Sequence, residues 1–358
     1  MPVSTPFANT DLPYRPTDLP DFRPGIGLVG CGEIAKHHLQ AYVDAGYQVK
    51  ALCDIHPEKA RRYQQAFYPE ADLYSDYRDL LADDQIAIVD VATHPHHRPA
   101  VIEQAIQAGK HVLSQKPFVT DLDEGERLAE LADRHGVYLA VNQNGRWAPH
   151  FSYIREAIAA GWLGEIVSAH FAVHWDHSWV KGTPFEEVKH LILFDYAIHW
   201  FDLVNCIMDN NSALRVYASF ARSLDQEVRP NLLAQSLIEY PSRQATLVFD
   251  GHTTSGGLNT SFVVGTNATI RSEGIDENSQ KVTVSTSAGE WRPPLVGRWF
   301  NDGFHGAMAE LMRAIAEKRQ PTHSGRENLR SLALCFAAVQ SAETHKPVVP
   351  GDARRMPG

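Results

Sequence analysis

The chain has 358 residues, enough for two domains that each bury a core, and it carries a net charge of −10. This acidic balance argues against a protein that binds nucleic acid or an anionic membrane, because both tasks need clustered lysine and arginine. The four cysteines form no C-x-x-C pair, no apolar run is long enough to span a membrane, and no signal peptide is evident. We therefore expect a cytoplasmic protein with no membrane or nucleic-acid partner.

A proline-rich arm occupies residues 1–24, where six prolines lie among polar residues. Proline resists helix formation and favours extended backbone. The arm is expected either to be a disordered tail or to lie along its own or a neighbouring subunit.

The stretch IGLVGCGEIAKHH passes from an apolar strand through a glycine-rich turn into a helix. It carries the G-x-G-x-x-A fingerprint of dinucleotide binding. Gly30 permits the tight turn, Gly32 lets the backbone approach a pyrophosphate, and Ala35 lets the helix pack closely on the strand. Glu33 and Ile34 lie at the helix N-terminus, whose unpaired amides are suited to phosphates.

Asp54 closes the next apolar strand, about 20 residues after Gly32, where a ribose-binding acid is expected. A carboxylate there accepts hydrogen bonds from the ribose hydroxyls and repels a 2′-phosphate. Residues 55–57 offer no arginine to receive such a phosphate, although Arg61 and Arg62 follow one helical turn later. The cofactor is therefore expected to be NAD rather than NADP.

From 25 to 141, short apolar runs alternate with amphipathic stretches, which predicts an α/β domain with a doubly wound parallel sheet. The strands are expected at 25–30, 48–53, 86–92, 111–114 and 137–141, and the helices at 33–45, 57–67, 97–108 and 121–135. We assign residues 25–147 to this dinucleotide-binding Rossmann domain.

After residue 147 the pattern changes to consecutive strands with short turns such as YPSRQ, which predicts an antiparallel sheet. The expected elements are a helix at 150–160, strands around 165–174, 213–222, 232–240, 244–251 and 260–271, and helices at 303–318 and 326–344.

Two polar segments follow strands of the first domain. Lys116 ends the strand HVLSQKPF, and ligands of a doubly wound sheet bind outside the carboxyl ends of its strands. Lys116 is therefore expected near the nicotinamide, with a solvated surface lysine as the alternative. The segment VNQNGRW places Asn144 and Arg146 beside the same crevice. Their role there is expected to be either structural or functional.

Asp195, His199 and Asp202 occur at helical spacing in FDYAIHWFDL, which predicts that they share one face of a helix. The rest of this helix is nearly all apolar, and charged groups in such surroundings cost free energy unless they are paired or used. The spacing therefore favours a functional site over a surface histidine with nearby acids.

Taken in order, the fingerprint, Asp54, the GKHVLSQKP segment and the D-x-x-x-H-x-x-D helix resemble the Gfo/Idh/MocA family of glucose-fructose oxidoreductase and inositol dehydrogenase over about residues 25–345. The resemblance implies that 148–325 form an α/β domain for substrate binding and oligomerisation. Its large open, mostly antiparallel sheet commonly assembles homodimers or homotetramers. The resemblance also implies that the C-terminal helix and tail, 326–358, return to the Rossmann domain.

The resemblance also implies roles for single residues. Lys116 matches the lysine of the family's Glu-Lys-Pro motif, with Gln115 in place of the glutamate, and Asp195 and His199 match its D-x-G-x-H motif. The histidine-rich turn at 93–99 lies where the family places a loop beside the nicotinamide, so we expect no metal there. The expected cofactor contacts are Gly30, Gly32, Glu33, Ile34, Asp54, Thr93, His94, His97, Gln115, Lys116 and Asn144.

Substrate binding is expected at an aromatic and polar cluster. Trp175 and His177 follow the first strand of the second domain, and their faces and hydrogen-bonding groups suit a sugar ring, with packing at the sheet as the alternative. The expected substrate contacts are Lys116, Arg146, Trp175, His177, Asp195 and His199.

These residues suit oxidation of a secondary alcohol. An imidazole, whose ordinary pKa is about 6.5, can take the hydroxyl proton, so His199 is the expected base, oriented by Asp195. Lys116 would donate a hydrogen bond to the reacting oxygen, although lysine as the acid-base group remains an alternative. We expect an NAD-dependent dehydrogenase of a sugar, glycoside or cyclitol. The alternatives are redox-assisted glycoside cleavage without net NADH and a non-catalytic nucleotide-sensing regulatory protein.

Overall fold

The computed structural model describes residues 11–208 and 212–357, so residues 1–10 of the expected arm lie outside the described residues. The chain divides into two compact units. The parallel-sheet unit comprises Arg15–Trp147 and Phe300–Leu329. The open-sheet unit comprises the described arm residues 11–14 together with 148–299 and 330–357.

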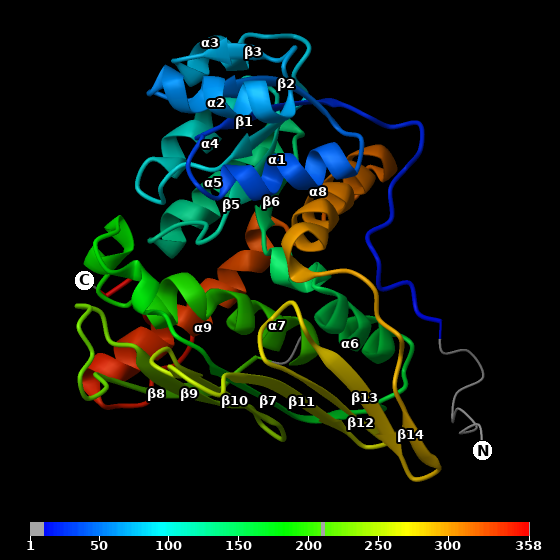
Figure 1. The fold of residues 1–358 in the computed structure, drawn as a ribbon, viewed down its shortest axis with the longest axis vertical. Helices are drawn as coiled ribbons and strands as arrows, with labels where there is room; N and C mark the ends of the chain where they lie inside the picture. The colour runs from blue at the N-terminus through cyan, green and yellow to red at the C-terminus, as the bar shows by residue number, and fades with distance from the viewer. Residues whose placement is uncertain (1–10, 209–211, 358) are drawn as a thin grey trace. The chain divides into compact units, whose positions relative to one another are not determined.

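Six parallel strands form the sheet of the parallel-sheet unit, in the order β3-β2-β1-β4-β5-β6. This is the doubly wound order of a dinucleotide-binding fold, which confirms the expected fold class. The strands are β1 (Gly25–Val29), β2 (Gln48–Cys53), β3 (Asp72–Tyr74), β4 (Ile88–Val91), β5 (His111–Gln115) and β6 (Leu139–Asn142). The helices between them are α1 (Ala35–Asp44), α2 (Pro57–Phe67), α3 (Tyr77–Leu81), α4 (Arg98–Gln107) and α5 (Leu122–His135), and η1 (Asn144–Trp147) follows β6 (Figure 1).

The ends of helix α5 illustrate how the sequence sets these boundaries. The Asp121 side chain accepts a hydrogen bond from the Asp123 amide at the N-terminus, and Gly136 closes the C-terminus in the left-handed conformation with φ 67°. The short β3 and α3, absent from the expectation, have three and five residues.

A buried polar cluster fastens α1 to the sheet. The Asp90 carboxylate on β4 accepts hydrogen bonds from Tyr42 Oη and pairs with His38 Nδ1, each at 2.7 Å. All three side chains are fully buried, and the surroundings raise the pKa of the Tyr42 hydroxyl, chiefly through burial and next through Asp90. The helix that follows the glycine-rich turn is thereby held in place on the strand beside it.

Helix α8 (Trp299–Glu317) completes the core of this unit. Its side chains Phe304, Met308, Leu311 and Met312 join the cluster formed by β1, α1 and β2. The sequence analysis expected the C-terminal helix and tail, 326–358, to return to this domain. In the structure, α9 (Gly325–Thr344) belongs to the open-sheet unit from Arg330 on. The apolar stripe of α8 fits the α1 side of the sheet, whereas only the first residues of α9 contribute to this unit.

Eight strands form the second sheet, in the order β14-β13-β12-β11-β7-β10-β9-β8. All pairings are antiparallel except that of β7 with β10. The strands are β7 (Ile166–His174), β8 (Arg215–Ala221), β9 (Leu233–Glu239), β10 (Gln244–Asp250), β11 (Leu258–Gly265), β12 (Ala268–Gly274), β13 (Lys281–Thr286) and β14 (Gly289–Trp291). The mostly antiparallel sheet confirms the expected class of the second domain.

One expected strand, 260–271, is instead a hairpin of β11 and β12. The turn forms because the Thr266 and Asn267 amides donate to the Glu165 and Leu163 carbonyls, at 2.9 and 3.0 Å. A Cβ at Gly265 would lie 2.2 Å from the Leu163 carbonyl oxygen, so only glycine fits there.

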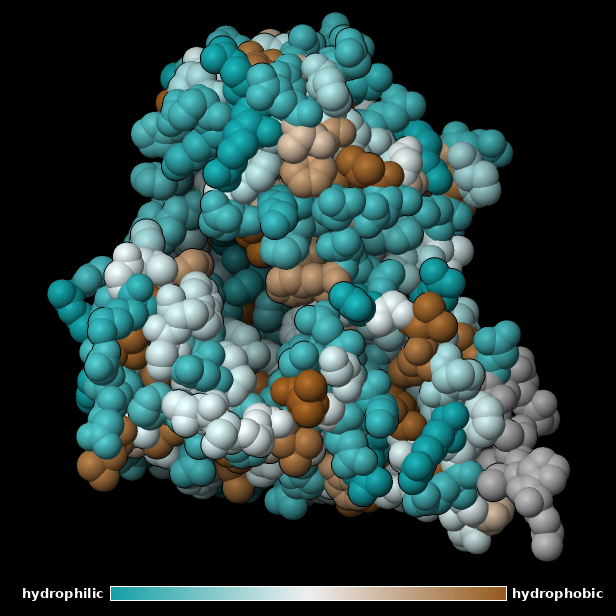
Figure 2. Space-filling view, in the orientation of Figure 1, coloured by the Kyte–Doolittle hydropathy of each residue, from teal (hydrophilic) through white to brown (hydrophobic). Residues whose placement is uncertain are grey.

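Helices α6 (Pro149–Ala159), α7 (Ile198–Met208) and α9 lie on one face of this sheet (Figure 1). Alternate strand residues on the other face remain exposed, among them Tyr217, Leu237, Val248, Leu258 and Phe262. In the part of the chain that the structure describes, no helix is long and apolar enough to cross a membrane. The face of the molecule seen in Figure 2 is mostly hydrophilic, with its apolar side chains in small groups.

Candidate functional site

The glycine-rich turn between β1 and α1 has the geometry that its fingerprint requires. Gly30 has φ +100°, and a Cβ there would lie 2.8 Å from the Ala92 carbonyl carbon, so both conformation and space demand glycine. No heavy atom of the described residues lies within 4 Å of the position that a Cβ on Gly32 would take. The turn therefore leaves open space over Gly32, where a pyrophosphate can approach the backbone.

Asp54 is fixed against this turn. Its carboxylate accepts hydrogen bonds from the Cys31 amide at 2.7 Å and from the His56 amide at 2.8 Å. An ionised carboxylate offers about four acceptor positions, so two amide bonds leave capacity for ribose hydroxyls. The carboxylate that the sequence singled out for ribose binding thus lies at the fingerprint.

Arg62, the nearby cation that left NADP open, has partners of its own. Its guanidinium lies 4.7 Å from the centre of the Tyr63 ring, and its Nη2 donates to Tyr63 Oη at 3.0 Å and to Glu33 Oε1 at 3.4 Å. Tyr63 Oη in turn donates to the Gly32 carbonyl at 3.1 Å. These contacts and Asp54 fit NAD.

The ends of β4 and β5 are joined by a buried arginine that the sequence analysis missed. Arg98 is 2% exposed, and its guanidinium donates to the Thr93 carbonyl at 2.6 Å and to the Pro117 carbonyl. It thereby fixes the turn that carries Thr93 relative to the segment that carries Lys116. Arg98 begins α4 within the sequence HHRP. The sequence analysis interpreted this segment only as a histidine-rich turn and gave Arg98 no role.

Two polar side chains, one after β4 and one after β6, lack a hydrogen-bond partner among the described residues. The Thr93 hydroxyl is buried and unbonded, and so are both amide atoms of Gln143, whose side chain is 1% exposed. Buried polar groups normally have hydrogen-bond partners, so these groups are suited to a bound ligand or an ordered water. Gln143 lies in the segment VNQNGRW, but the sequence analysis did not select it as a site residue. Only its burial in the structure identifies it as a candidate.

Lys116 follows the last residue of β5 and is partly buried. The Gln115 side chain, 4% exposed, accepts a hydrogen bond from the Lys116 backbone amide at 3.1 Å through Oε1. A neutral amide thus performs the positioning that a glutamate would otherwise perform. His94 and His97 are exposed in the neighbouring turn, with His94 stacked on His96 at 5.4 Å.

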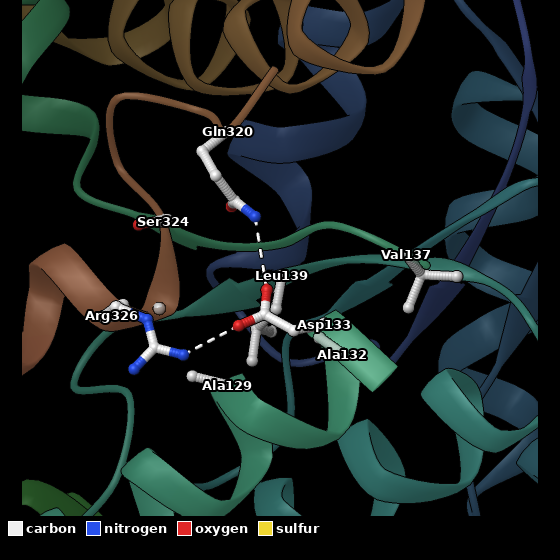
Figure 3. A pocket seen from close by; sticks show the side chains of 9 residues that line it. Ala129, Ala132, Asp133, Val137, Leu139, Gln320, Ser324 and Arg326 are labelled. Carbon is white, nitrogen blue, oxygen red and sulfur yellow. Dashed lines mark hydrogen bonds and ion pairs between the residues drawn. The ribbon is translucent and has the colours of Figure 1, made fainter. Parts of the chain in front are cut away.

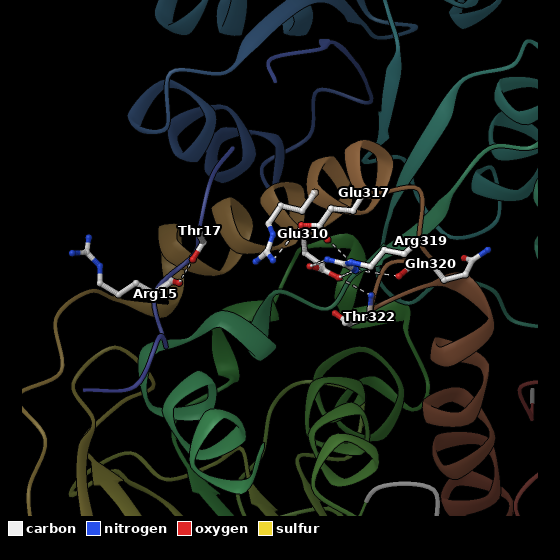
Figure 4. A network of polar contacts seen from close by, with 8 residues as sticks. Arg15, Thr17, Glu310, Glu317, Arg319, Gln320 and Thr322 are labelled. Carbon is white, nitrogen blue, oxygen red and sulfur yellow. Dashed lines mark hydrogen bonds and ion pairs between the residues drawn. The ribbon is translucent and has the colours of Figure 1, made fainter. Parts of the chain in front are cut away.

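Arg146 and Asn144, at the end of β6, are 5% and 2% exposed. Arg146 Nη1 donates to the Thr322 carbonyl at 2.7 Å, and the Thr322 amide donates to Glu310 Oε1 at 2.9 Å within the network drawn in Figure 4. Arg146 therefore has a structural task in anchoring the 319–324 segment, and its part in substrate binding stays a prediction.

Asp195 and His199 do not lie on one continuous α-helix, contrary to the expectation. Residues Leu191–Tyr196 form a π-helix, with the Ala197 amide donating to the Ile192 carbonyl at 2.7 Å, and α7 begins only at Ile198. The D-x-x-x-H spacing therefore spans a change of helix type, which often occurs at functional sites. The His199 ring is 8% exposed and packs edge-on against Trp299 at 5.3 Å.

Asp202, the third charged residue of this motif, is structurally paired. Its Oδ1 accepts a hydrogen bond from Ser331 Oγ at 2.9 Å, and Asn205 donates to the same hydroxyl at 3.1 Å. Asp202 therefore fastens α7 to α9, which accounts for a charged residue in an apolar helix.

The structure brings the two expected sugar-binding residues together. Trp175 Nε1 donates to His177 Nδ1 at 2.8 Å, and because an indole only donates, neutral His177 carries its proton on Nε2. The Trp175 ring stacks on Tyr196 at 4.2 Å with an interplanar angle of 23°. The pair thus adjoins the π-helix that contains Asp195.

The candidate residues belong to two units. The fingerprint, Asp54, Lys116 and Arg146 lie in the parallel-sheet unit, and the residues from Trp175 to His199 lie in the open-sheet unit. Within 11–208 and 212–357, no three His, Cys, Asp or Glu side chains are grouped to hold a metal ion.

One small hollow in the parallel-sheet unit is too small for a substrate. It holds about 10 Å³ and is lined by residues of α5, β6 and 320–326 (Figure 3). Arg326 and Gln320 both donate to the Asp133 carboxylate across it, at 2.7 and 3.3 Å. These contacts fasten the start of α9 to α5.

Two family models match the chain. The model described as an oxidoreductase family with an NAD-binding Rossmann fold matches residues 25–143, and the GFO/IDH/MocA C-terminal domain matches residues 151–271. Among curated relatives, a D-apiose dehydrogenase of Paraburkholderia graminis is 28% identical over 90% of this chain and 88% of its own length. An inositol 2-dehydrogenase of Rhizobium meliloti is 24% identical over 90% of this chain and 98% of its own length.

Solved structures share the fold. An Agrobacterium radiobacter oxidoreductase in complex with NAD+, L-tartaric acid and magnesium has a TM-score of 0.81 at 21% identity, covering 92% of this chain and 99% of that one. A levoglucosan dehydrogenase in complex with NADH and levoglucosan has a TM-score of 0.78 at 20% identity, covering 92% of this chain and 100% of that one. With the two family models and the site geometry, these matches lead to one conclusion: the chain is an NAD-binding oxidoreductase that belongs to the Gfo/Idh/MocA family.

Proposed function

We propose that this protein is an NAD-dependent dehydrogenase that transfers a hydride between nicotinamide and a secondary hydroxyl or ketone of a sugar, glycoside or cyclitol. The observation that carries the proposal is the carboxylate of Asp54, held at the fingerprint turn by the Cys31 amide. The names of the relatives, D-apiose dehydrogenase and inositol 2-dehydrogenase, support the substrate class.

The cofactor site is proposed to use the carboxyl ends of the parallel strands. Gly32 and the amides that open α1 would meet the pyrophosphate, and Asp54 the adenosine ribose. The unbonded Thr93 hydroxyl, a cofactor contact proposed from the sequence, gains support from its burial. The proposed contacts are Gly30, Gly32, Glu33, Ile34, Asp54, Thr93, His94, His97, Gln115, Lys116 and Asn144.

The proposed substrate contacts are Lys116, Arg146, Trp175, His177, Asp195 and His199. When bound, the nicotinamide supplies the hydride acceptor. His199 takes the hydroxyl proton, Asp195 orients its imidazole, and Lys116 donates a hydrogen bond to the reacting oxygen. The aromatic face of Trp175 would meet the C–H face of the sugar, and His177 Nε2 would donate to a hydroxyl.

The test is NADH absorbance at 340 nm with purified protein and NAD+ across sugars, alkyl and aryl glycosides and inositols, with released aglycone assayed in parallel. Steady NADH formation with one class of substrate is the expected result. Release of aglycone without NADH would mean redox-assisted glycoside cleavage. Tight NAD binding with neither product would indicate a nucleotide sensor, and both outcomes would refute the dehydrogenase.

The division of labour between the two candidate acid-base groups needs its own experiment. Lys116→Met and His199→Ala are compared by the pH dependence of kcat/KM with the best substrate of the panel. The proposal expects His199→Ala to remove the acidic limb of the profile and Lys116→Met to lower kcat without moving that limb. A chemical step that survives both changes would refute the assignment.

We further propose that the protein forms a homo-oligomer, a dimer or tetramer, through the exposed face of the eight-stranded sheet. Leu237 on β9 and Phe262 on β11 are each 40% exposed on this face, and unpartnered apolar side chains favour association. Light scattering should give a multiple of the chain mass, and Leu237→Lys should lower it. A monomer in the unchanged protein would refute this.

The proposed compartment is the cytoplasm. All four cysteines are free thiols, and burial raises the pKa of Cys31 and Cys53 to about 12, with Asp54 contributing. Such thiols persist in a reducing compartment. Localisation of a tagged full-length chain tests this, and a secreted product would contradict it.

A further inference from the structure

A series of aromatic rings leads outward from the π-helix of the open-sheet unit. Tyr196 stacks on Trp175, the Trp175 and His177 rings lie 5.0 Å apart, and the His177 and Trp179 rings lie 5.0 Å apart. Phe185 follows, 5.6 Å from Trp179 at 68°. These spacings are those of interacting aromatic pairs. The series therefore connects the residue beside Asp195 to the surface.

Exposure rises along this series. His177 is 4% exposed, whereas Trp179 is 57% and Phe185 40% exposed. Tryptophan normally buries most of its large apolar surface, so a Trp and a Phe that pair edge to face in the open are unusual. The exposed Trp179 ring offers a flat apolar surface to a ligand, and the Phe185 ring stands beside it at 68°.

The loop that carries both rings is held in place by its own polar contacts. The Gly182 amide donates to Glu186 at 2.8 Å, and Thr183 Oγ1 donates to the Val180 carbonyl at 2.7 Å. Ion pairs of Lys181 with Glu227 and of Arg229 with Glu187 connect the loop to the segment before β9. The exposed rings are therefore pre-organised, which lowers the entropy that a ligand must overcome.

We propose that Trp179 and Phe185 form an outer subsite that binds a second ring, linked glycosidically to the sugar that Trp175 and His177 hold. The chemistry recognised is a flat ring with an apolar face, either an aromatic aglycone or a second sugar. This inference rests on the proposed function and deepens it: the preferred substrates are glycosides rather than free sugars or cyclitols. Continuity of the rings with the inner pair favours this occupant over a second protein.

The test measures binding to the NADH-saturated full-length protein, in which the alcohol cannot be oxidised. The probes are phenyl β-D-glucopyranoside, methyl β-D-glucopyranoside and cellobiose, followed by calorimetry. The phenyl glycoside is expected to bind about threefold to tenfold more tightly than the methyl glycoside, as one aromatic stacking contact predicts. Trp179→Ala should remove this preference without changing the affinity for the methyl glycoside, and Trp179→Phe should restore most of it.

Leu224→Ala is the matched control, because it removes an exposed apolar side chain of the same unit, 84% exposed. It should leave the preference intact. Cellobiose separates the two kinds of second ring: tightening over the methyl glycoside that also depends on Trp179 identifies a sugar, and its absence identifies an aromatic aglycone.

Equal affinity for the phenyl and methyl glycosides, failure of both to bind, or a preference that survives Trp179→Ala would overturn the outer subsite. A change in oligomeric mass with Trp179→Ala, without a change in glycoside affinity, would assign the rings to a subunit contact instead. If sugars are oxidised but the two glycosides bind alike, the subsite fails and the dehydrogenase stands. If no sugar is oxidised while the preference depends on Trp179, the dehydrogenase fails and the subsite stands.

Discussion

Replacing Glu310 by glutamine should destabilise the parallel-sheet unit by about 3 kcal/mol at neutral pH. The Glu310 carboxylate is 8% exposed and accepts hydrogen bonds from Arg319 at 2.7 and 3.0 Å and from the Thr322 amide at 2.9 Å (Figure 4). Burial alone would raise its pKa, but Arg319 and the Thr322 amide outweigh burial and lower the pKa from 4.5 to about 2. The charged form is therefore strongly stabilised in the folded protein.

The magnitude follows from this shift. Each pKa unit corresponds to about 1.36 kcal/mol, so a shift of about 2.5 units gives roughly 3 kcal/mol. Glutamine resembles the protonated acid in lacking the charge, so the variant should lose this amount. Because the folded pKa lies below the unfolded one, the contribution is complete above about pH 4.5 and disappears as the pH falls toward 2.

The assay is urea unfolding followed by circular dichroism at several pH values between 7 and 3. The difference between the unchanged protein and Glu310→Gln should be constant from pH 7 to about pH 5 and should shrink below pH 4.5. Glu317→Gln is the control, because Glu317 bonds the same Arg319 but is exposed, and it should change stability little. A variant as stable as the unchanged protein at pH 7, or a difference as large at pH 3 as at pH 7, would refute the reasoning.

Two further predictions concern the cofactor side. Asp54→Ala should weaken NAD+ binding by about 10-fold to 100-fold, because hydrogen bonds to a charged acceptor are lost. Asp54→Asn keeps an acceptor for the Cys31 amide and should bind NAD+ more tightly than Asp54→Ala. Fluorescence titration with NADH measures both variants, and an unchanged affinity in Asp54→Ala would contradict the ribose role. Arg98→Met should lower kcat/KM by about 10-fold or more, because it leaves the Thr93 and Pro117 carbonyls without their shared donor, and Arg98→Lys should restore part of it. If Arg98→Met has normal stability and an unchanged kcat/KM, the hydrogen bonds from Arg98 to the ends of β4 and β5 are not needed for activity.

The sequence predicted the parts of the fold that depend on local rules. The fingerprint turn and the bounds expected for the helix at 121–135 follow from single residues, such as Asp121 and Gly136, whose conformation or hydrogen bonding is decided within a few positions. The π-helix at Leu191–Tyr196 could not be predicted, because an apolar segment with helical spacing looks the same whether its bonds run to the fourth or the fifth residue.

The site shows the same limit. Asp54 was predictable because its distance from the fingerprint is fixed by a strand, a turn and a helix of usual lengths. Arg98 and Gln143 were not, because an arginine in a histidine-rich loop and a glutamine among polar neighbours look like surface residues. Only burial, at 2% and 1% exposure, distinguishes them. Long-range contacts create that burial, and local sequence does not encode them.

Gln115 separates two roles that a glutamate before the lysine would combine. The amide oxygen accepts the hydrogen bond from the Lys116 backbone, so the positioning role survives without a charge. Gln115→Glu would keep that acceptor and add a negative charge, which attracts the ammonium of the adjacent Lys116. If Lys116 acts in its protonated form, kcat/KM in the variant should persist to higher pH while the affinity for NAD+ stays the same. A profile that does not move would mean that the protonation of Lys116 is not part of the chemistry, and the proton transfer would then fall to His199 alone.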